Sequence, residues 1–173
     1  MAVSLIPLTA AVSGTLPLAN GGTATTGAPA FAAYPSVAAN LSNSTWTKIA
    51  LNTKLYDTNN NFNTSTYRFT APVAGKYNLS YHLTWYADNT AYTSDLGMGF
   101  FKNGSSYVLG EYQISNVLNG ISDFTVASAT VLMDLAANDY VEIKINPFGS
   151  SYGSGNFYFG SGLRTNFSGY LVG

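Results

Sequence analysis

The stretch Tyr67–Trp85 reads YRFTAPVAGKYNLSYHLTW and carries the clearest structural pattern in the sequence. From Lys76 onward, apolar or aromatic residues alternate with polar ones through Tyr77, Leu79, Tyr81, Leu83 and Trp85. A period of two places successive side chains on opposite faces of a β-strand. Pro72 and Gly75 stand before this strand, where they interrupt the ladder and permit a sharp turn. The stretch therefore predicts a turn followed by an antiparallel strand with one buried face.

Alternation of the same kind recurs along the chain. Phe124–Met133 has apolar or small residues on both faces, which is typical of a central strand covered by the opposite sheet and by a neighbouring subunit. Asn103-Gly104 is the strongest hairpin signal. Further strands are expected at Trp46–Leu55, Tyr67–Thr70, Gly97–Lys102, Tyr107–Tyr112, Val141–Ile145 and Thr165–Val172. Roughly eight to ten short strands with regular turn spacing predict an all-β sandwich or jelly roll.

The composition of the 173 residues agrees with a β-rich fold. Asn, Ser, Thr and Gly make up 70 residues, and Tyr, Phe and Trp another 25. Uncharged polar residues combined with aromatic ones favour strands and turns over disorder, which lacks aromatic residues. The length fits one compact domain with a tail.

The charges exclude several classes of function. Only 9% of the residues are charged, and the net charge is −1. Nucleic-acid binding needs a basic footprint, and attachment to an anionic membrane needs a polybasic segment, so neither is expected. The chain has no cysteine, which excludes a disulfide scaffold and a thiolate metal site.

The first 29 residues differ from the rest. The start Met1–Gly14 lacks the basic region of a secretory signal, and Pro7 interrupts its apolar run. The run is also too short to span a bilayer. Thr15–Gly27 is small and polar with paired glycines, which is typical of an extended linker. We expect an extended N-terminal arm over residues 1–29 and a globular domain over residues 30–173.

A short segment of this arm resembles a phage sequence. Leu16–Thr23 is similar to the Leu-Pro-x-Ala-Asn-Gly-Gly-Thr segment of bacteriophage tail-fibre and other appendage proteins. The continuation Ala24-Thr25-Thr26 departs from the usual Gly-Ala-Thr. The resemblance implies an arm that attaches the protein to a virion, whereas a generic flexible linker is the alternative interpretation.

The remainder of the chain resembles a second family. Tyr67–Tyr77 is similar to the Phe-Thr-Ala-Pro-x-x-Gly-x-Tyr signature of the globular head of complement component one, subcomponent q, whose jelly roll is shared with the tumour necrosis factor family. Three further segments follow in that family's order: Phe101–Gly104, Leu132–Val141 and Asn166–Val172. The resemblance implies a ten-stranded jelly roll that forms a homotrimer. Where the family usually has glycine, this chain has Asn138, which also tolerates a left-handed backbone. Gly169 is expected to leave room for a close backbone or aromatic neighbour.

A homotrimer also fits the composition. A surface with so few charges and so many aromatic residues is prone to associate, and a threefold arrangement can bury much of it. We expect the trimer interface to include Phe124, Val126, Phe167 and Tyr170. The arm residues expected to anchor the trimer in a particle are Leu5, Ile6, Leu16 and Leu18.

Catalytic patterns are weak. His82, the single histidine, lies on the polar face of a strand without a nucleophile elbow nearby. Gly149–Gly153 matches Gly-x-Ser-x-Gly but lacks the following helix that the elbow requires. Asp57–Asn61 begins like a calcium loop, yet Phe62 replaces the required glycine, so an Asn-rich turn is favoured. No catalytic residue, metal site or cofactor is predicted.

Two long segments are candidates for binding. Tyr86–Asp95 and Phe148–Gly162 are rich in Asn, Ser, Gly and Tyr, which provide stacking area and adaptable hydrogen bonds on a rigid scaffold. They suit glycan contacts, or else they simply cover the ends of the sheets. The candidate contact residues are Tyr86, Asp88, Asn89, Tyr92, Asp95, Tyr152 and Asn156.

These observations lead to one main hypothesis. The chain is expected to be a non-enzymatic structural protein of a phage particle, a trimeric short tail fibre or spike on the tail or capsid surface that contacts a host receptor or glycan. The alternatives are a capsid decoration, cement or head-fibre protein with the same fold, and a secreted recognition module without a virus. No nucleic acid and no membrane insertion are expected.

Overall fold

The computed structural model describes residues 28–41, 45–87, 94–114, 123–148, 157–159 and 161–172. Their regular structure is almost entirely β-strand, with one short 3₁₀ turn, η2 (Gly162–Arg164). None of these residues forms a helix that is long and apolar enough to cross a membrane. The strands are β1 (Ala30–Tyr34), β2 (Ala39–Leu41), β3 (Thr47–Lys48), β4 (Thr53–Asp57), β5 (Phe62–Asn63), β6 (Arg68–Thr70), β7 (Gly75–Ala87), β8 (Ser94–Lys102), β9 (Ser105–Ile114), β10 (Asp123–Leu135), β11 (Tyr140–Phe148), β12 (Phe157–Phe159) and β13 (Asn166–Leu171).

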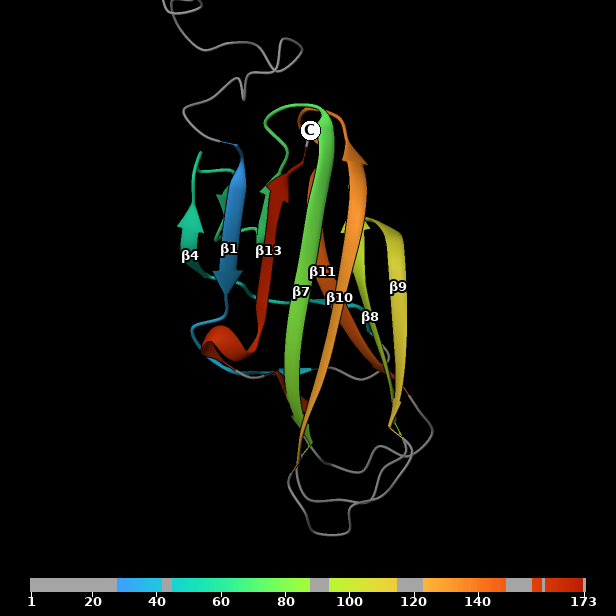
Figure 1. The fold of residues 1–173 in the computed structure, drawn as a ribbon. Helices are drawn as coiled ribbons and strands as arrows, with labels where there is room; N and C mark the ends of the chain where they lie inside the picture. Colours follow the sequence, from blue (N-terminus) through green and yellow to red (C-terminus); the bar gives the residue numbers. More distant parts are fainter. Residues whose placement is uncertain are drawn as a thin grey trace, which may run out of the picture.

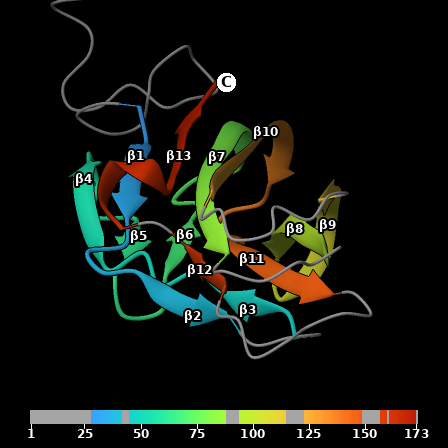
Figure 2. The same ribbon diagram turned by 90° about the horizontal axis from the view of Figure 1, so that it is seen from below.

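The strands form two antiparallel sheets packed face to face (Figures 1 and 2). Sheet A has the order β2-β12-β7-β13-β1-β4, with β10 paired to β7. Sheet B has the order β5-β6-β11-β8-β9, with β3 paired to β11. Neighbours in the sheets are distant in sequence, as in β13 beside β1, which is the connectivity of a jelly roll. The prediction of an all-β jelly roll is confirmed.

Strand β7 organises sheet A. Its whole length pairs with β10, from Ala87 opposite Asp123 to Gly75 opposite Leu135. Its other edge pairs with β13, and Asn166 lies opposite His82. The alternation expected from the sequence is confirmed where side chains are described, because Tyr77, Leu79, Tyr81 and Leu83 are all buried.

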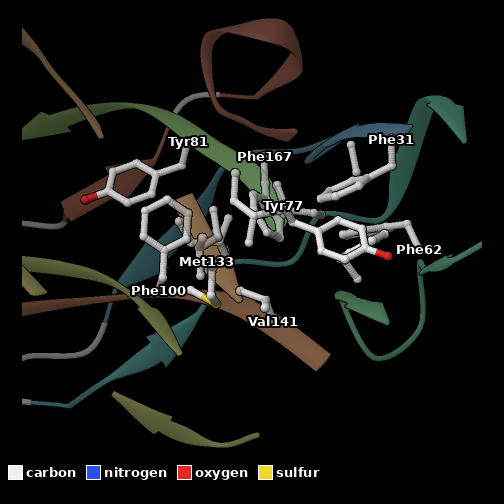
Figure 3. Packing of buried hydrophobic residues seen from close by; sticks show 14 of the residues in the cluster. Phe31, Phe62, Tyr77, Tyr81, Phe100, Met133, Val141 and Phe167 are labelled. Atoms are coloured by element: carbon white, nitrogen blue, oxygen red, sulfur yellow. The ribbon is translucent and has the colours of Figure 1, made fainter. Parts of the chain in front are cut away.

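The core between the sheets is built around aromatic rings (Figure 3). Phe31 of β1 stacks on Phe69, with ring centroids 4.4 Å apart, and meets Phe167 edge-on at 4.9 Å. Tyr81 of sheet A packs against Phe100 of sheet B at 4.9 Å. The Phe31–Phe69 and Tyr81–Phe100 pairs join the two sheets, and all three pairs add to the stabilisation from burial.

The strand expected over Trp46–Leu55 is interrupted, so this prediction is wrong in part. The chain pairs with β11 of sheet B at Thr47–Lys48 and then with β1 of sheet A from Thr53 onward. Between them two tight turns form, with Leu51 N donating to Ile49 O and Asn52 N donating to Ala50 O, both at 2.9 Å. The buried side chains of Ile49 and Leu51 close the sandwich where the chain crosses.

The expectation of a central strand at Phe124–Met133 is also wrong for the described pairings. β10 pairs with β7 alone and therefore forms an edge of sheet A. Its inward side chains pack on the core, as Met133 does, whereas Val126 and Leu132 on the outward side are exposed. Small and apolar residues on both faces indicated two covered faces, but only one is covered within a single chain.

Two turns follow the sequence signals closely. Asn103 and Gly104 both have positive φ, 50° and 86°, as a tight hairpin between β8 and β9 requires. Asn138 has φ 72°, so it adopts the left-handed conformation expected at this position. Both predictions are confirmed.

Gly169 lies in β13 where no side chain fits. A Cβ atom there would clash with Leu79 Cδ2 and would lie 2.9 Å from Asn78 O and 3.0 Å from Phe31 Cε1. The expected close backbone and aromatic neighbours are therefore present.

We predict that Gly169→Ala lowers the free energy of unfolding by about 1–3 kcal/mol, because the added methyl group must displace packed atoms. Denaturant unfolding followed by circular dichroism measures this loss. Ser168→Ala, one residue earlier on the outward face, is the control and should cost no more than about 1 kcal/mol for its hydrogen bond to Ser80. Equal stability of Gly169→Ala and the wild type would contradict the tight packing.

Candidate binding surfaces

The outward face of sheet A is nearly free of charge. Along β7 and β13 it carries polar side chains, among them Ser80 and Ser168, whose hydroxyls lie 3.1 Å apart, and Asn78, which donates to the Tyr170 hydroxyl. In the described part of this face, ionised pairing is limited to one end, where Lys76 pairs with Asp134. An uncharged sheet face of this kind costs little to desolvate on association.

An apolar hollow of about 290 Å³ lies on this face where β4, β1 and β13 meet η2. Exposed Leu55 and Tyr56 of β4 border it on one side and Leu163 of η2 on the other. The residues lining it are Ala32, Ala33, Tyr34, Leu55, Tyr56, Leu163, Asn166 and Ser168. We call this hollow with its rim the sheet A patch.

A second group of exposed apolar side chains lies on β9 of sheet B and on the outward face of β10 in sheet A, which are edge strands of the two sheets. It comprises Tyr107 and Val108 of β9 with Val126 and Leu132 of β10. In Figure 1 these strands stand at the side opposite β4. We call these four residues the β9–β10 patch. One chain thus presents two separate groups of exposed apolar side chains. Such groups, unlike apolar residues scattered singly over a surface, are typical of interaction sites.

The structure divides the four expected interface residues. Val126 and Tyr170 are exposed, at 48% and 50%. The prediction that Phe167 lies at the trimer interface is wrong, because its side chain is fully buried against Phe31 in the core and cannot contact another chain. Phe124 belongs to β10, but its side chain lies outside the described residues.

The expected contact loops fall largely outside the described residues. This holds for Asp88, Asn89, Tyr92, Tyr152 and Asn156, and for the side chains of Tyr86 and Asp95. The strands that lead into these loops all end at the same end of the sandwich, since Ala87 pairs with Asp123, and Asp95 pairs with both Phe148 and Gln113. The arm residues Leu5, Ile6, Leu16 and Leu18 also lie outside the described residues.

The Asp57 segment is a self-contained turn. The Asp57 carboxylate accepts hydrogen bonds from the backbone N–H groups of Asn61 and Phe62 at 2.9 and 3.0 Å and pairs with Lys54 at 2.9 Å. The carboxylate oxygens are thus engaged by the chain itself, as the Asn-rich turn interpretation expects. No group of three or more His, Cys, Asp or Glu side chains that could hold a metal occurs in the described part of the chain.

The outward face of sheet B carries a charge cluster that sequence reasoning missed. Glu142 of β11 is 1% exposed, and its Oε2 atom lies 2.8 Å from both Lys48 Nζ and Arg68 Nε. Its Oε1 atom lies 3.0 Å from Lys144 Nζ. Burial alone would raise the pKa of Glu142, but the hydrogen bonds from the three cations outweigh it and lower that pKa to about 2. We call Glu142, Lys48, Arg68 and Lys144 the Glu142 cluster.

Aromatic rings support two of these cations. The Arg68 guanidinium lies 4.0 Å from the centre of the Tyr140 ring, and Lys144 Nζ lies 4.4 Å from the centre of the Phe101 ring. Phe101 in turn packs edge-on against Trp46 at 5.2 Å. The cations are therefore held over ring faces, which attract positive charge.

Only part of this cluster could have been read from the sequence. Glu142 and Lys144 are two residues apart, so the alternation places them on one face of a strand. Lys48 and Arg68 join them through the pairing of β3 and β6 with β11, which no local pattern specifies.

A second carboxylate fixes the hairpin beside the cluster. Hydrogen bonds from Lys102, Asn103 and the Ala136 N–H lower the pKa of Asp139 to about 2. Asn103 completes the connection by accepting from the Tyr140 N–H at 2.9 Å. This network joins the β8–β9 turn to the start of β11 and has a structural role.

Comparisons with known proteins agree with this architecture. The model of the C1q domain matches residues 30–172. The globular domain of zebrafish complement 1qA protein aligns with a TM-score of 0.56 at 22% identity, covering 85% of this chain and 98% of its own. Eiger TNF from S. frugiperda aligns with a TM-score of 0.53 at 8% identity, covering 84% and 92%. No curated protein matches this sequence. The chain therefore belongs to the C1q domain family, and its two-sheet sandwich is the jelly roll that this family shares with tumour necrosis factor.

Proposed function

We propose that this protein is a non-enzymatic binding module that acts as a homotrimer. The observation that carries the proposal is the pair of apolar surfaces on one chain. The sheet A patch is a hollow beside β4, and the β9–β10 patch lies on the edge strands at the opposite lateral side of the sandwich, with Val126 and Leu132 on the outward face of β10. Contact between the edge of one copy and the face of the next is heterologous, and such contacts form a closed ring when the rotation between copies permits it. The family resemblance implies three copies.

The trimer is tested by placing charge in the β9–β10 patch. The variant Val126→Asp/Leu132→Asp is expected to be monomeric at micromolar concentration, because association would bury two unpaired carboxylates per contact. Light scattering coupled to size exclusion measures the mass. Both side chains are exposed in the single chain, so its circular dichroism spectrum should not change.

The control is Val37→Asp, which alters an exposed valine that lies on neither patch. This variant should stay trimeric. A wild type that is monomeric at micromolar concentration, or a trimer that survives the double substitution, would contradict the proposal.

The position of Ala28, the first described residue, supports a module that is attached at one end and binds at the other. Ala28 precedes β1 at the end of the sandwich where β7 starts and β10 finishes, because Ala30 pairs with Tyr170, which pairs in turn with Asn78 (Figure 1). The strands flanking residues 88–93 and 149–156 end at the opposite end. We propose that those residues contact a glycan or receptor and that residues 1–29 attach the trimer.

We further propose that the attachment is to a phage particle, as a short tail fibre or spike. The support is the Leu16–Thr23 segment, which is similar to a segment of phage appendage proteins, together with the low charge of the chain. The same trimer could serve as a capsid decoration, cement or head-fibre protein.

Electron cryomicroscopy of purified particles tests this location. Density of the jelly-roll trimer on the tail supports the appendage. Density on the capsid surface would contradict the tail role and favour the decoration role. Absence of the protein from purified particles would overturn both. Unchanged adsorption after replacing residues 86–95 with a Gly-Ser segment would contradict a receptor role for that loop.

A further inference from the structure

The Glu142 cluster is unbalanced in charge. Among the ion pairs of the described residues, the other three each join one lysine to one aspartate: Lys54–Asp57, Lys76–Asp134 and Lys102–Asp139. Glu142 instead faces three cations. The cluster therefore carries two uncompensated positive charges in a chain whose net charge is −1.

The arrangement of these cations costs stability in the absence of a further anion. Lys48 Nζ and Arg68 Nε lie 2.8 Å from the same oxygen, so they cannot be more than twice that distance apart. Lys48 also stands directly opposite Lys144 across the β3–β11 pair. Like charges directly opposite each other in a sheet are destabilising. One cation would suffice to neutralise the carboxylate, so charge balance does not explain the other two.

The cations are accessible from solvent, whereas the carboxylate is not. The side chains of Lys48, Arg68 and Lys144 are 27%, 33% and 19% exposed, and that of Glu142 is 2% exposed. An incoming anion therefore meets positive groups above a buried carboxylate. The Tyr140 and Phe101 rings hold two of the cations in place, which reduces the ordering that binding requires.

We propose that Lys48, Arg68 and Lys144 form a binding site for an anionic group, a sulfate or carboxylate, carried by an acidic polysaccharide. The cluster is compact and fits one anionic group at a time, unlike the extended basic track that nucleic acid requires. Thr66, whose backbone carbonyl accepts a hydrogen bond from Lys48 Nζ at 3.1 Å, is exposed beside the cluster and has an uncharged hydroxyl that suits sugar hydroxyls. Arg68 supplies the planar guanidinium that favours oxyanions.

This site is separate from the loops proposed to contact a receptor. Glu142 lies near the start of β11, whereas those loops follow the strand ends around Phe148 and Ala87. The site does not depend on the proposed trimer, although three copies on one particle would raise the avidity for a repeating polymer.

The test compares two variants with the same change of charge. Lys48→Gln/Lys144→Gln makes the cluster neutral and leaves Glu142 paired with Arg68. Lys54→Gln/Lys76→Gln removes two lysines from balanced pairs elsewhere. Binding of the full chain to dextran sulfate, polygalacturonate, neutral dextran and duplex DNA is measured in low salt by biolayer interferometry, after circular dichroism has shown that each variant is folded.

We expect the wild type to bind dextran sulfate or polygalacturonate and not neutral dextran. Binding to dextran sulfate would identify the anionic group as a sulfate, and binding to polygalacturonate would identify it as a carboxylate. The cluster variant should bind about tenfold more weakly, and the control variant within about twofold of the wild type. Equal losses in both variants, no binding to either acidic polymer, or equally tight binding to DNA would overturn the proposal. If the cluster variant does not fold, Lys144→Gln alone is measured against Lys76→Gln with the same criteria.

Discussion

Phe167→Ala is expected to lower the free energy of unfolding of the protomer by about 3–5 kcal/mol, a large part of the roughly 5–15 kcal/mol that stabilises a typical domain. The side chain is fully buried and touches three other core rings, those of Phe31, Phe62 and Phe100. Its truncation leaves a cavity between two sheets that strand pairing holds in place, so little collapse can compensate. Chemical denaturation of the wild type and the variant at equal concentration measures the loss.

Tyr170→Ala is the matched control for this variant. It removes a comparable ring from the same strand, but that ring is 50% exposed on the outward face. The protomer should lose about 1 kcal/mol or less, the value of the hydrogen bond from Asn78. If Phe167→Ala unfolded no more easily than Tyr170→Ala and only weakened association, the assignment of Phe167 to the protomer core would be wrong.

Glu142→Gln is expected to destabilise the fold at pH 7 by on the order of 3 kcal/mol. The neutral amide cannot balance three cations, and removing one partner of a buried charge network leaves the other partners unpaired. The network also ties β3 and β6 to β11, since Lys48 and Arg68 come from those strands. The measurement is thermal or denaturant unfolding at neutral pH.

The same carboxylate makes the wild type sensitive to acid. The pKa of Glu142 falls from 4.5 to about 2 in the folded chain, so the unfolded chain binds more protons between these values. Its contribution is complete above pH 4.5 and is lost progressively as the pH falls toward 2. Stability should therefore decline with acidification in this window, and the decline should be smaller in Glu142→Gln.

Asp139 titrates in the same window, so the wild-type curve alone does not identify the group responsible. The variant Asp139→Asn provides the comparison, because it leaves the Glu142 cluster intact. Acid denaturation profiles of the three proteins separate the two contributions. An identical slope in the wild type and Glu142→Gln would show that Glu142 does not carry this pH dependence.

Much of the architecture was predictable from local sequence patterns. The alternation over Tyr77–Leu83 placed the buried face of β7, and Asn103-Gly104 and Asn138 marked turns that adopt positive φ. Gly169 was recognisable as a position of close approach. These features depend on the allowed dihedral angles of single residues and on the period of a strand, which are properties of neighbouring residues.

The interface residues and the Glu142 cluster were harder to predict from the sequence. Phe167 and Tyr170 are three residues apart, so strand periodicity puts them on opposite faces, yet only the packing shows that Phe167 faces the core. The crossing at Ile49–Asn52 depends on the chain leaving β11 for β1. Neither feature has a local signature.

The sequence by itself determined an all-β sandwich, because turn residues and strand alternation act over a few residues, and four segments in a fixed order carried its resemblance to the C1q head. The tertiary structure alone decided that β10 is an edge, that Phe167 is internal, and that Lys48 and Arg68 meet Glu142 from positions 94 and 74 residues away. Those contacts depend on the register between strands distant in sequence, and register is set by the packing of the whole sandwich.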